Sequence, residues 1–259
     1  MSTSQSRFQF PRRIYSVENH LMINDISQFS SFLELAKALN INLLVLERFP
    51  INKLPELIEE FASYNLVQLK DIISEVPNYT HCVITNDWTS LIQALIKHFK
   101  EGKIVLASRL TLNVDTIDAA KRYLSQNRNL YHIISITSSS DKVLKWAAHD
   151  RRVDYITITL NSNTKIVDKG LCSLMKQHSK PFEILLYPLI TARSDRELSE
   201  LIRNGKRLTE LLKLHRNLYV FAMGVKNPFE FRTRIQLRHI ANIVGFQYNE
   251  TKYACFYYA

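Results

Sequence analysis

The stretch Phe182-Glu-Ile-Leu-Leu-Tyr-Pro-Leu189 carries the clearest strand signal in the chain. A basic helical pattern follows it, and a second apolar run, Leu218 to Met223, again precedes a helical pattern. Alternation of this kind is typical of βα units arranged around a parallel sheet. The last third of the chain is therefore predicted to consist of consecutive βα units.

The same alternation extends over nearly the whole sequence. Eight runs rich in apolar and β-branched residues are predicted strands: Ile14 to Met22, Ile41 to Arg48, His81 to Thr85, Ile104 to Leu110, Tyr131 to Thr137, Val153 to Leu160, Phe182 to Leu189 and Leu218 to Met223. Eight strands fit one α/β domain with a TIM-barrel-like (β/α) fold. An open, doubly wound sheet stays an alternative, because periodicity does not distinguish it from a closed barrel.

Residues 51–79 break the regularity, since two short helical patterns occur there without a clear strand, although Asn65 to Leu69 is a candidate. The barrel is therefore expected to be irregular in its first half. We see no linker and no repeat of fixed period, so residues 1–259 are expected to form a single domain. It carries a short polar amino-terminal tail, Met1 to Pro11, and an aromatic carboxyl-terminal tail with Tyr253, Phe256, Tyr257 and Tyr258.

Helix boundary signals accompany the predicted elements. Asp25, Asp115 and Ser194 stand where helices begin, and Glu197 follows Ser194 at capping-box spacing. Gly102 and Gly245 stand where helices end. These signals support helices between the predicted strands.

Composition indicates a globular protein of 259 residues, 46% of them hydrophobic. Its three cysteines, Cys82, Cys172 and Cys255, have no zinc-finger spacing, so we interpret them as buried or free thiols in a reducing cytoplasm. Neither a signal peptide nor an apolar run of membrane-spanning length is present in the sequence. We expect a cytoplasmic protein without a membrane association.

Motifs for common cofactor and metal chemistry are missing. Only five glycines occur, and none forms a nucleotide-binding loop. The eight histidines include no HxH or HExxH pair, and His149 beside Asp150 is better explained by a helix end. Asp154 and Glu183 stand near the starts of predicted strands, away from the end where barrel enzymes carry catalysis. We expect no cofactor, no metal and no catalytic residue in the chain.

Positive charge is concentrated in one segment. Between Thr191 and His239 lie eleven Lys/Arg and five Asp/Glu, which accounts for six of the ten formal positive charges of the chain. Spacing of 100° per residue places Arg196, Arg203 and Arg207 on one stripe of a helix, opposite a row of leucines. Guanidinium groups suit phosphate oxygens because they donate two coplanar hydrogen bonds.

A second basic helix is predicted nearby, with Arg232 at its start and Arg234 and Arg238 one turn apart. In a barrel the two helices are neighbours, so we expect one continuous cationic patch that binds RNA phosphates. The predicted RNA-binding residues are Arg193, Arg196, Arg203, Lys206, Arg207, Arg232, Arg234 and Arg238. A solvated face partly neutralised by Glu200 and Glu210 is the structural alternative.

The succession of these segments resembles a known family. Arg151-Arg-Val-Asp-Tyr-Ile-Thr157, the stretch from Phe182 to Ile190, the basic helix, and Ala222-Met-Gly-Val-Lys-Asn-Pro-Phe-Glu-Phe-Arg232 before Ile240-Ala-Asn-Ile-Val-Gly-Phe246 are similar to ribonuclease P protein component 3. That family is the thirty-kilodalton subunit of archaeal and eukaryotic ribonuclease P. The resemblance covers roughly residues 130–246. Two departures are Ala222-Met223-Gly224 where Ser-Gly-Ala is frequent, and Arg234 where proline is common.

The resemblance implies a TIM-barrel-like subunit of the ribonuclease P endoribonuclease, which removes 5′ leaders from precursor tRNA. It implies that catalysis belongs to the RNA and its magnesium ions, and that the chain itself is noncatalytic. The implied partners are ribonuclease P RNA, precursor tRNA and ribonuclease P protein component 2, in a heterodimer or heterotetramer. It also implies an RNA or partner contact at Arg232.

Two other functions stay open on the sequence. A metal-dependent barrel hydrolase requires histidines and carboxylates that converge at the carboxyl ends of the strands. An interaction scaffold without an RNA role requires only that the basic surface binds an acidic protein.

Overall fold

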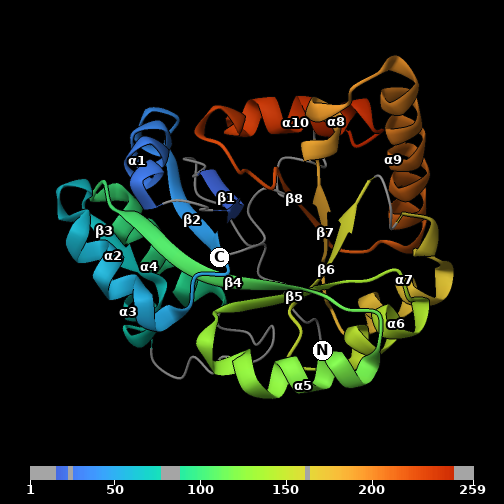
Figure 1. Cartoon of the computed structure of the whole chain (residues 1–259), viewed down its shortest axis with the longest axis horizontal. Coiled ribbons are helices and arrows are strands. Elements are labelled where there is room, and N and C mark those ends of the chain that lie inside the picture. The colour runs from blue at the N-terminus through green and yellow to red at the C-terminus, as the bar shows by residue number, and fades with distance from the viewer. Residues whose placement is uncertain (1–15, 23–25, 77–87, 161–163, 248–259) are drawn as a thin grey trace, which may run out of the picture.

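The computed structural model describes residues 16–22, 26–76, 88–160 and 164–247 (Figure 1). Its strands are parallel, and their order is β1-β2-β4-β5-β6-β7-β8, with β3 paired to β4. Their bounds are β1 Ser16–Met22, β2 Ile41–Glu47, β3 Leu66–Gln68, β4 Ile104–Asn113, β5 Ile133–Thr137, β6 Tyr155–Thr159, β7 Phe182–Leu185 and β8 Tyr219–Ala222. The curled parallel sheet confirms the predicted TIM-barrel-like fold.

The two edges of the sheet approach each other. Leu21 in β1 forms a parallel bridge with Val225, just after β8, and the Met22 amide donates to the Val225 carbonyl at 2.8 Å. This short contact is the closure between the first and last strands (Figure 1). Among the described residues a single bridge joins β1 to the segment after β8, so the sheet is an irregular barrel.

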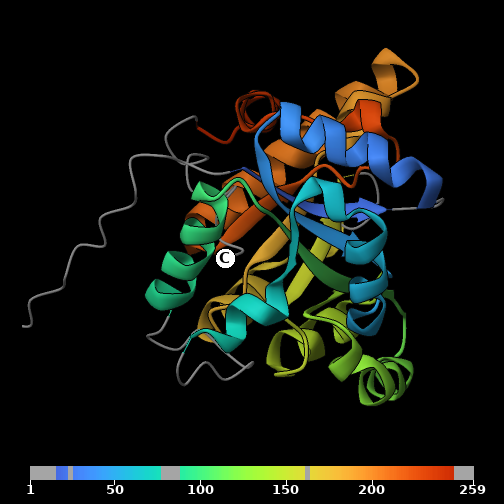
Figure 2. The same ribbon diagram turned by 90° about the vertical axis from the view of Figure 1, so that its left-hand side faces the viewer.

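Helices surround the sheet, and Figure 2 shows the helices of the first half beside the strands. Their bounds are α1 Phe29–Ala38, α2 Leu54–Glu60, α3 Leu69–Ser74, α4 Trp88–Lys100, α5 Ile117–Asn127, α6 Asp141–His149, α7 Lys169–Gln177, α8 Tyr187–Thr191, α9 Asp195–His215 and α10 Arg234–Ile243. Short 3-10 helices lie at 26–28, 51–53, 62–64, 128–130, 164–166 and 228–230. None of the described helices is long and apolar enough to span a membrane.

Alternation along the strands divides the sheet into two faces. One face carries aliphatic residues that pack with α1, α5, α6, α7, α9 and α10 in a large hydrophobic core. The other face carries Leu43, Val45, Val105 and Ala107, which pack with residues of α3 and α4 in a second cluster. The register pairs Leu43 with Val105 and Glu47 with Arg109, so charged residues continue the second face.

The first half is irregular because two strands share one edge of β4. β3 pairs with residues 104–106, and β5 pairs with residues 109–113 of the same strand. The candidate strand at Asn65 to Leu69 is confirmed by β3, and Asn65 turns into it with a positive φ of 58°. The predicted strand at His81 to Thr85 lies outside the described residues, as do Asp25, the polar amino-terminal tail and the aromatic carboxyl-terminal tail.

Two local predictions were wrong. The strand predicted to reach Leu189 ends at Leu185, and α8 begins at Tyr187, because Pro188 fits the first turn of a helix where no amide donor is needed. Thr116 caps α5, and its side chain accepts a hydrogen bond from the Ala119 amide. Asp115 instead accepts bonds from Ser138 and Ser139, which join the ends of β4 and β5.

The other boundary predictions that fall on described residues agree with the structure. Ser194 is the N-cap of α9, and Gly102 and Gly245 follow helices with φ values of 74° and 96°. Such left-handed backbone favours glycine after a helix. In a full capping box the Glu197 carboxylate would accept from the amide of the N-cap residue Ser194. Here it accepts from the amide of the preceding residue, Arg193, at 2.7 Å.

Candidate nucleic-acid interface

Helix α9 presents the predicted arginine stripe to solvent. Arg196, Arg203 and Arg207 are exposed, whereas Leu201, Leu208 and Leu212 are buried in the core. The prediction of one packed and one cationic side is therefore confirmed for this helix. Arg193 before the helix and Lys206 beside the stripe are exposed as well.

Contact with the end of α10 fixes the orientation of α9. Gly205 lies so close to Val244 that an added Cβ atom would stand 2.5 Å from its Cγ1 atom. The Thr209 hydroxyl donates to the Val244 carbonyl at 2.8 Å, and Lys213 Nζ donates to the Gly245 carbonyl at 3.1 Å. The small residue at position 205 permits this close approach, which turns the arginine side of α9 outward.

The arginine stripe carries a net positive charge. Within the described part of the chain, Arg196, Arg203 and Arg207 form no ion pair, and the exposed residues Glu200 and Glu210 flank them on the same side. Three guanidinium groups against two carboxylates leave an excess of positive charge on this face. Exposed guanidinium groups of this kind are suited to bind phosphate oxygens in a bidentate manner.

One arginine of helix α10 does not lie beside this stripe on the surface. Arg238 is only 4% exposed, so the expectation that it lies on the cationic surface was wrong. Position 238 adjoins the buried side of α10, which includes Leu237, Ala241 and Val244. The side chain of Arg234 lies outside the described part of the structure.

Arg232 is half-buried, and its guanidinium group is engaged locally. Its Nη1 atom donates to the carbonyl oxygens of Phe229 and Phe231, both at 2.8 Å. The exposed surface of α10 instead includes Ile235 and Ile243, and Phe229 in the preceding turn is 85% exposed. This region therefore includes exposed apolar side chains.

Sequence reasoning missed a buried ionic network on the inner face of the sheet. Arg109 in β4 lies between Glu47 of β2 and Glu183 of β7, and the side chains of all three are at most 2% exposed. Arg109 Nε lies 3.2 Å from Glu47 Oε2, and Nη2 lies 2.8 Å from Glu183 Oε2. The signal was present in the sequence, because Arg109 interrupts the apolar run of residues 104–112.

Hydroxyl groups from neighbouring strands complete this network. Ser135 Oγ accepts from Arg109 Nη2 at 2.8 Å, and Thr157 Oγ1 donates to Glu183 Oε2 at 2.7 Å. Thr111 donates to Glu47 through both its amide and its hydroxyl, each at 2.8 Å. Glu47, Arg109, Ser135, Thr157 and Glu183 are buried and Thr111 is half-buried, so the network links five strands in the interior of the sheet.

The remaining ionisable candidates have structural contacts. Asp154 accepts from the Ile134 amide at 2.8 Å, which ties the start of β6 to β5. His149 ends α6, as predicted, and its Nδ1 atom lies 2.8 Å from Nε2 of His178. Among the described residues no group of three or more His, Cys, Asp or Glu side chains is arranged to hold a metal ion.

Comparison with solved structures shows the same fold elsewhere. A chain in the cryo-EM structure of archaeal ribonuclease P with mature tRNA has 15% sequence identity and a TM-score of 0.61, and the match covers 91% of this chain and 85% of that chain. A Xaa-Pro dipeptidase with bound methionine in its active site has 8% identity and a TM-score of 0.53, over 93% and 73% of the two chains. At these identities the likeness shows the fold alone.

Comparison at the level of sequence is more specific. No curated protein matches the chain significantly. The family model described as RNase P subunit p30 matches residues 63–259, which is well over half of the chain. The match includes β3 to β8, the buried Arg109 and Glu183, and both basic helices. The chain therefore belongs to the RNase P subunit p30 family.

Proposed function

We propose that this chain binds RNA through the exposed arginine face of α9 and thereby assists the catalytic RNA of ribonuclease P. Membership of the family makes it a protein subunit of the holoenzyme that removes 5′ leaders from precursor tRNA. The observation that carries the RNA contact is the row Arg196, Arg203 and Arg207, exposed along one side of a helix that is packed on the other.

Phosphate contacts explain how such a surface helps a catalytic RNA. Each arginine that neutralises a phosphate releases condensed counterions, which favours compact RNA and lowers the concentration of magnesium needed for folding. Arg193 and Lys206 extend the surface on either side of the stripe. The contact fixes position rather than base sequence, because phosphates carry no sequence information.

Catalysis is assigned to the RNA and its magnesium ions, and the chain is proposed to bind no cofactor of its own. The charged residues on the inner face of the sheet, Arg109, Glu47 and Glu183, are buried in contacts with one another, and among the described residues no His, Cys, Asp and Glu side chains form a metal-binding group. This arrangement supports a noncatalytic subunit over the metal-dependent hydrolase.

The protein partner is proposed to be ribonuclease P protein component 2, in a heterodimer or heterotetramer in the cytoplasm. Three exposed apolar residues support a protein contact near α10: Phe229, Ile235 and Ile243 have exposed fractions of 85%, 54% and 51%. Large exposed apolar side chains are frequent at protein interfaces. Precursor tRNA and ribonuclease P RNA are the proposed nucleic-acid partners of the basic side.

The experiment is cleavage of precursor tRNA by the reconstituted RNA and protein subunits, with and without this chain. The test variant changes Arg196, Arg203 and Arg207 to Gln, and the matched control removes three exposed charges elsewhere, at Lys121, Arg122 and Lys142. We expect the test variant to lose activity at low magnesium and to recover at higher magnesium, whereas the control retains activity.

Equal activity of the two variants would contradict a role for the α9 surface in RNA binding. If omission of the whole chain leaves cleavage unchanged, the subunit function itself fails. The scaffold alternative is favoured if the test variant loses binding to an acidic protein while its affinity for RNA and the salt dependence of that affinity stay those of the wild type.

A further inference from the structure

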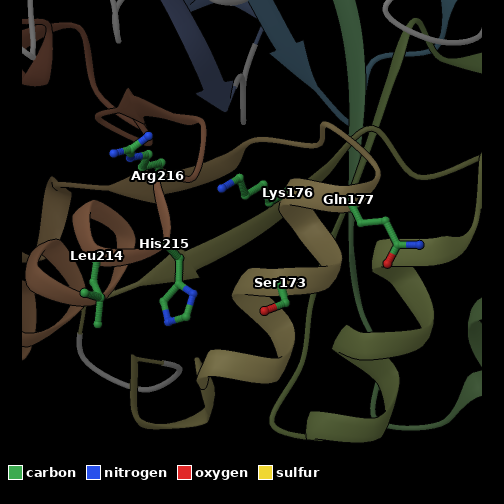
Figure 3. A pocket seen from close by; sticks show the side chains of 6 residues that line it. All are labelled: Ser173, Lys176, Gln177, Leu214, His215 and Arg216. Carbon is green, nitrogen blue, oxygen red and sulfur yellow. The ribbon is translucent and has the colours of Figure 1, made fainter.

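A groove lies between the carboxyl-terminal ends of α7 and α9 (Figure 3). Its volume is about 540 Å³, and its lining residues are Ser173, Lys176, Gln177, Leu214, His215 and Arg216. Three of these lie on α7, and the other three lie at the end of α9. None belongs to the RNA-binding residues predicted from the sequence.

The chemistry of this lining favours a polyanion. Lys176 and Arg216 are exposed cations, and Ser173, Gln177 and His215 supply uncharged or titratable donors, while no carboxylate lines the groove. Figure 3 shows Lys176 pointing from α7 toward the end of α9 that carries Arg216, and the Ser173 hydroxyl pointing toward the His215 ring. Lys176 and Ser173 of α7 thus face the end of α9.

A buried polar atom belongs to the same site. His215 Nε2 is shielded from solvent and has no hydrogen-bond partner in the described part of the chain. A buried ring nitrogen without a partner is costly, so it favours a ligand or water that supplies one. Oδ1 of Asn217, two residues further on, is likewise buried without a described partner, and Asn217 is 6% exposed.

Carbonyl groups at the carboxyl-terminal end of a helix usually disfavour an anion, but several of those near the groove accept hydrogen bonds. The Leu212 carbonyl accepts from the Asn217 amide at 3.0 Å, and the Lys213 carbonyl accepts from the Arg216 amide at 3.1 Å. On α7, the Cys172 carbonyl accepts from Asn217 Nδ2 at 2.7 Å. These acceptors are already bonded, and Lys176 and Arg216 are the charged side chains that line the groove.

The groove lies at the carboxyl-terminal end of α9, the helix that carries the arginine stripe. At 100° per residue, Leu214 projects from the same side of the helix as Arg196, Arg203 and Arg207, and it is 71% exposed. From Arg196 to Leu214 the helix rises about 27 Å, at 1.5 Å per residue. A strand of nucleic acid that follows the stripe toward the end of α9 therefore reaches the groove.

We infer that the groove between α7 and α9 binds the phosphate backbone of RNA through Lys176 and Arg216, as an extension of the α9 surface. This inference rests on the proposed RNA-binding function and adds a second contact to it. Lys176 and Arg216 each neutralise a phosphate, and His215 lines the same groove. An acidic protein segment is the competing ligand, and the experiment separates the two.

The test measures binding of the full-length chain to fluorescein-labelled ribonuclease P RNA by anisotropy over a series of salt concentrations. The variant carries Lys176→Gln and Arg216→Gln, and the control carries Lys121→Gln and Arg122→Gln, which removes two exposed charges from α5. A second variant, Lys176→Arg with Arg216→Lys, retains the charge. We expect the charge-removing variant to bind about tenfold more weakly, with a salt slope smaller by about 1.5, since each phosphate contact contributes about 0.7 to 0.9 to the slope.

The outcomes are distinct. The charge-removing variant and the control could bind RNA with equal affinity while the variant of Arg196, Arg203 and Arg207 binds more weakly. That result would overturn RNA binding by the groove and leave the proposed function standing. Absence of RNA binding by the wild type overturns both. Loss of affinity in the charge-conserving variant as well would assign the effect to altered structure and overturn the inference. Selective loss of binding to polyglutamate, with RNA binding retained, would identify an acidic protein as the ligand.

Discussion

Arg109 and Glu183 stand 74 positions apart in the sequence and meet in the interior of the sheet, where Arg109 Nη2 donates to Glu183 Oε2 at 2.8 Å. A second bond joins Nη1 to Oε1, so the contact is bidentate. Both side chains are fully buried, and Arg109 also reaches Glu47 on the other side of β4. One guanidinium group thus holds carboxylates from β2 and β7 within a single network.

Replacement of Arg109 by Ala is expected to lower the free energy of unfolding by about 3 to 5 kcal/mol, because it leaves buried carboxylates without their counter-ion. Urea denaturation measures this change. The control is Arg122→Ala on the exposed side of α5, for which a change within about 0.5 kcal/mol is expected. Equal midpoints for the two variants would show that the network does not stabilise the fold.

Replacement of Gly205 by Ala is expected to separate α9 from the end of α10, since the added methyl group would lie 2.5 Å from Val244 Cγ1. Overpacking of this kind costs about 1 to 3 kcal/mol of unfolding free energy. The Val244→Ala change should restore part of the loss when combined with Gly205→Ala, and a double-mutant cycle by urea denaturation measures the coupling. Simple additivity of the two changes would contradict the contact.

His178 is expected to make stability depend on pH. Desolvation, followed by the positive charges of His149, Lys180 and Arg151, lowers the pKa of His178 from its ordinary value of 6.5. The unfolded chain therefore binds this proton more readily, so the free energy of unfolding falls as the pH drops below about 6.5.

The variant His178→Gln should lose part of this pH dependence while keeping a side chain that can hydrogen-bond to His149. Urea midpoints of the wild type and the variant, compared above and below the ordinary histidine pKa, provide the measurement. A decrease of the same size in both proteins would rule out His178 as the source.

Cys172 is expected to resist alkylation in the folded protein. Burial, followed by the negative charge of Asp168, raises the pKa of this thiol to about 12, so almost none of the reactive thiolate is present at neutral pH. Peptide mass spectrometry after iodoacetamide treatment should find Cys172 unmodified in the native protein and modified in urea. Modification at equal rates in both conditions would contradict its burial.

Much of the fold could be predicted from local patterns. The strands that include Ile41, Ile104 and Phe221 follow from β-branched and apolar runs, and the exposed face of α9 follows from its helical periodicity. The segments that resemble ribonuclease P protein component 3 cover roughly residues 130–246, and the family match extends from residue 63 to residue 259. The irregular pairing of β3 with β4 was not predictable, because three residues give too short a pattern to specify register.

The sequence by itself determined the alternation of strands and helices, the arginine stripe of α9 and the family, since each depends on residue types at short spacing. Only the tertiary structure decided that Arg109 joins Glu47 and Glu183, that Arg238 is buried and that α7 and α9 enclose a cationic groove. Those relationships depend on how the sheet curls and how the helices tilt. Both are set by packing between residues far apart in the chain, which local periodicity does not record.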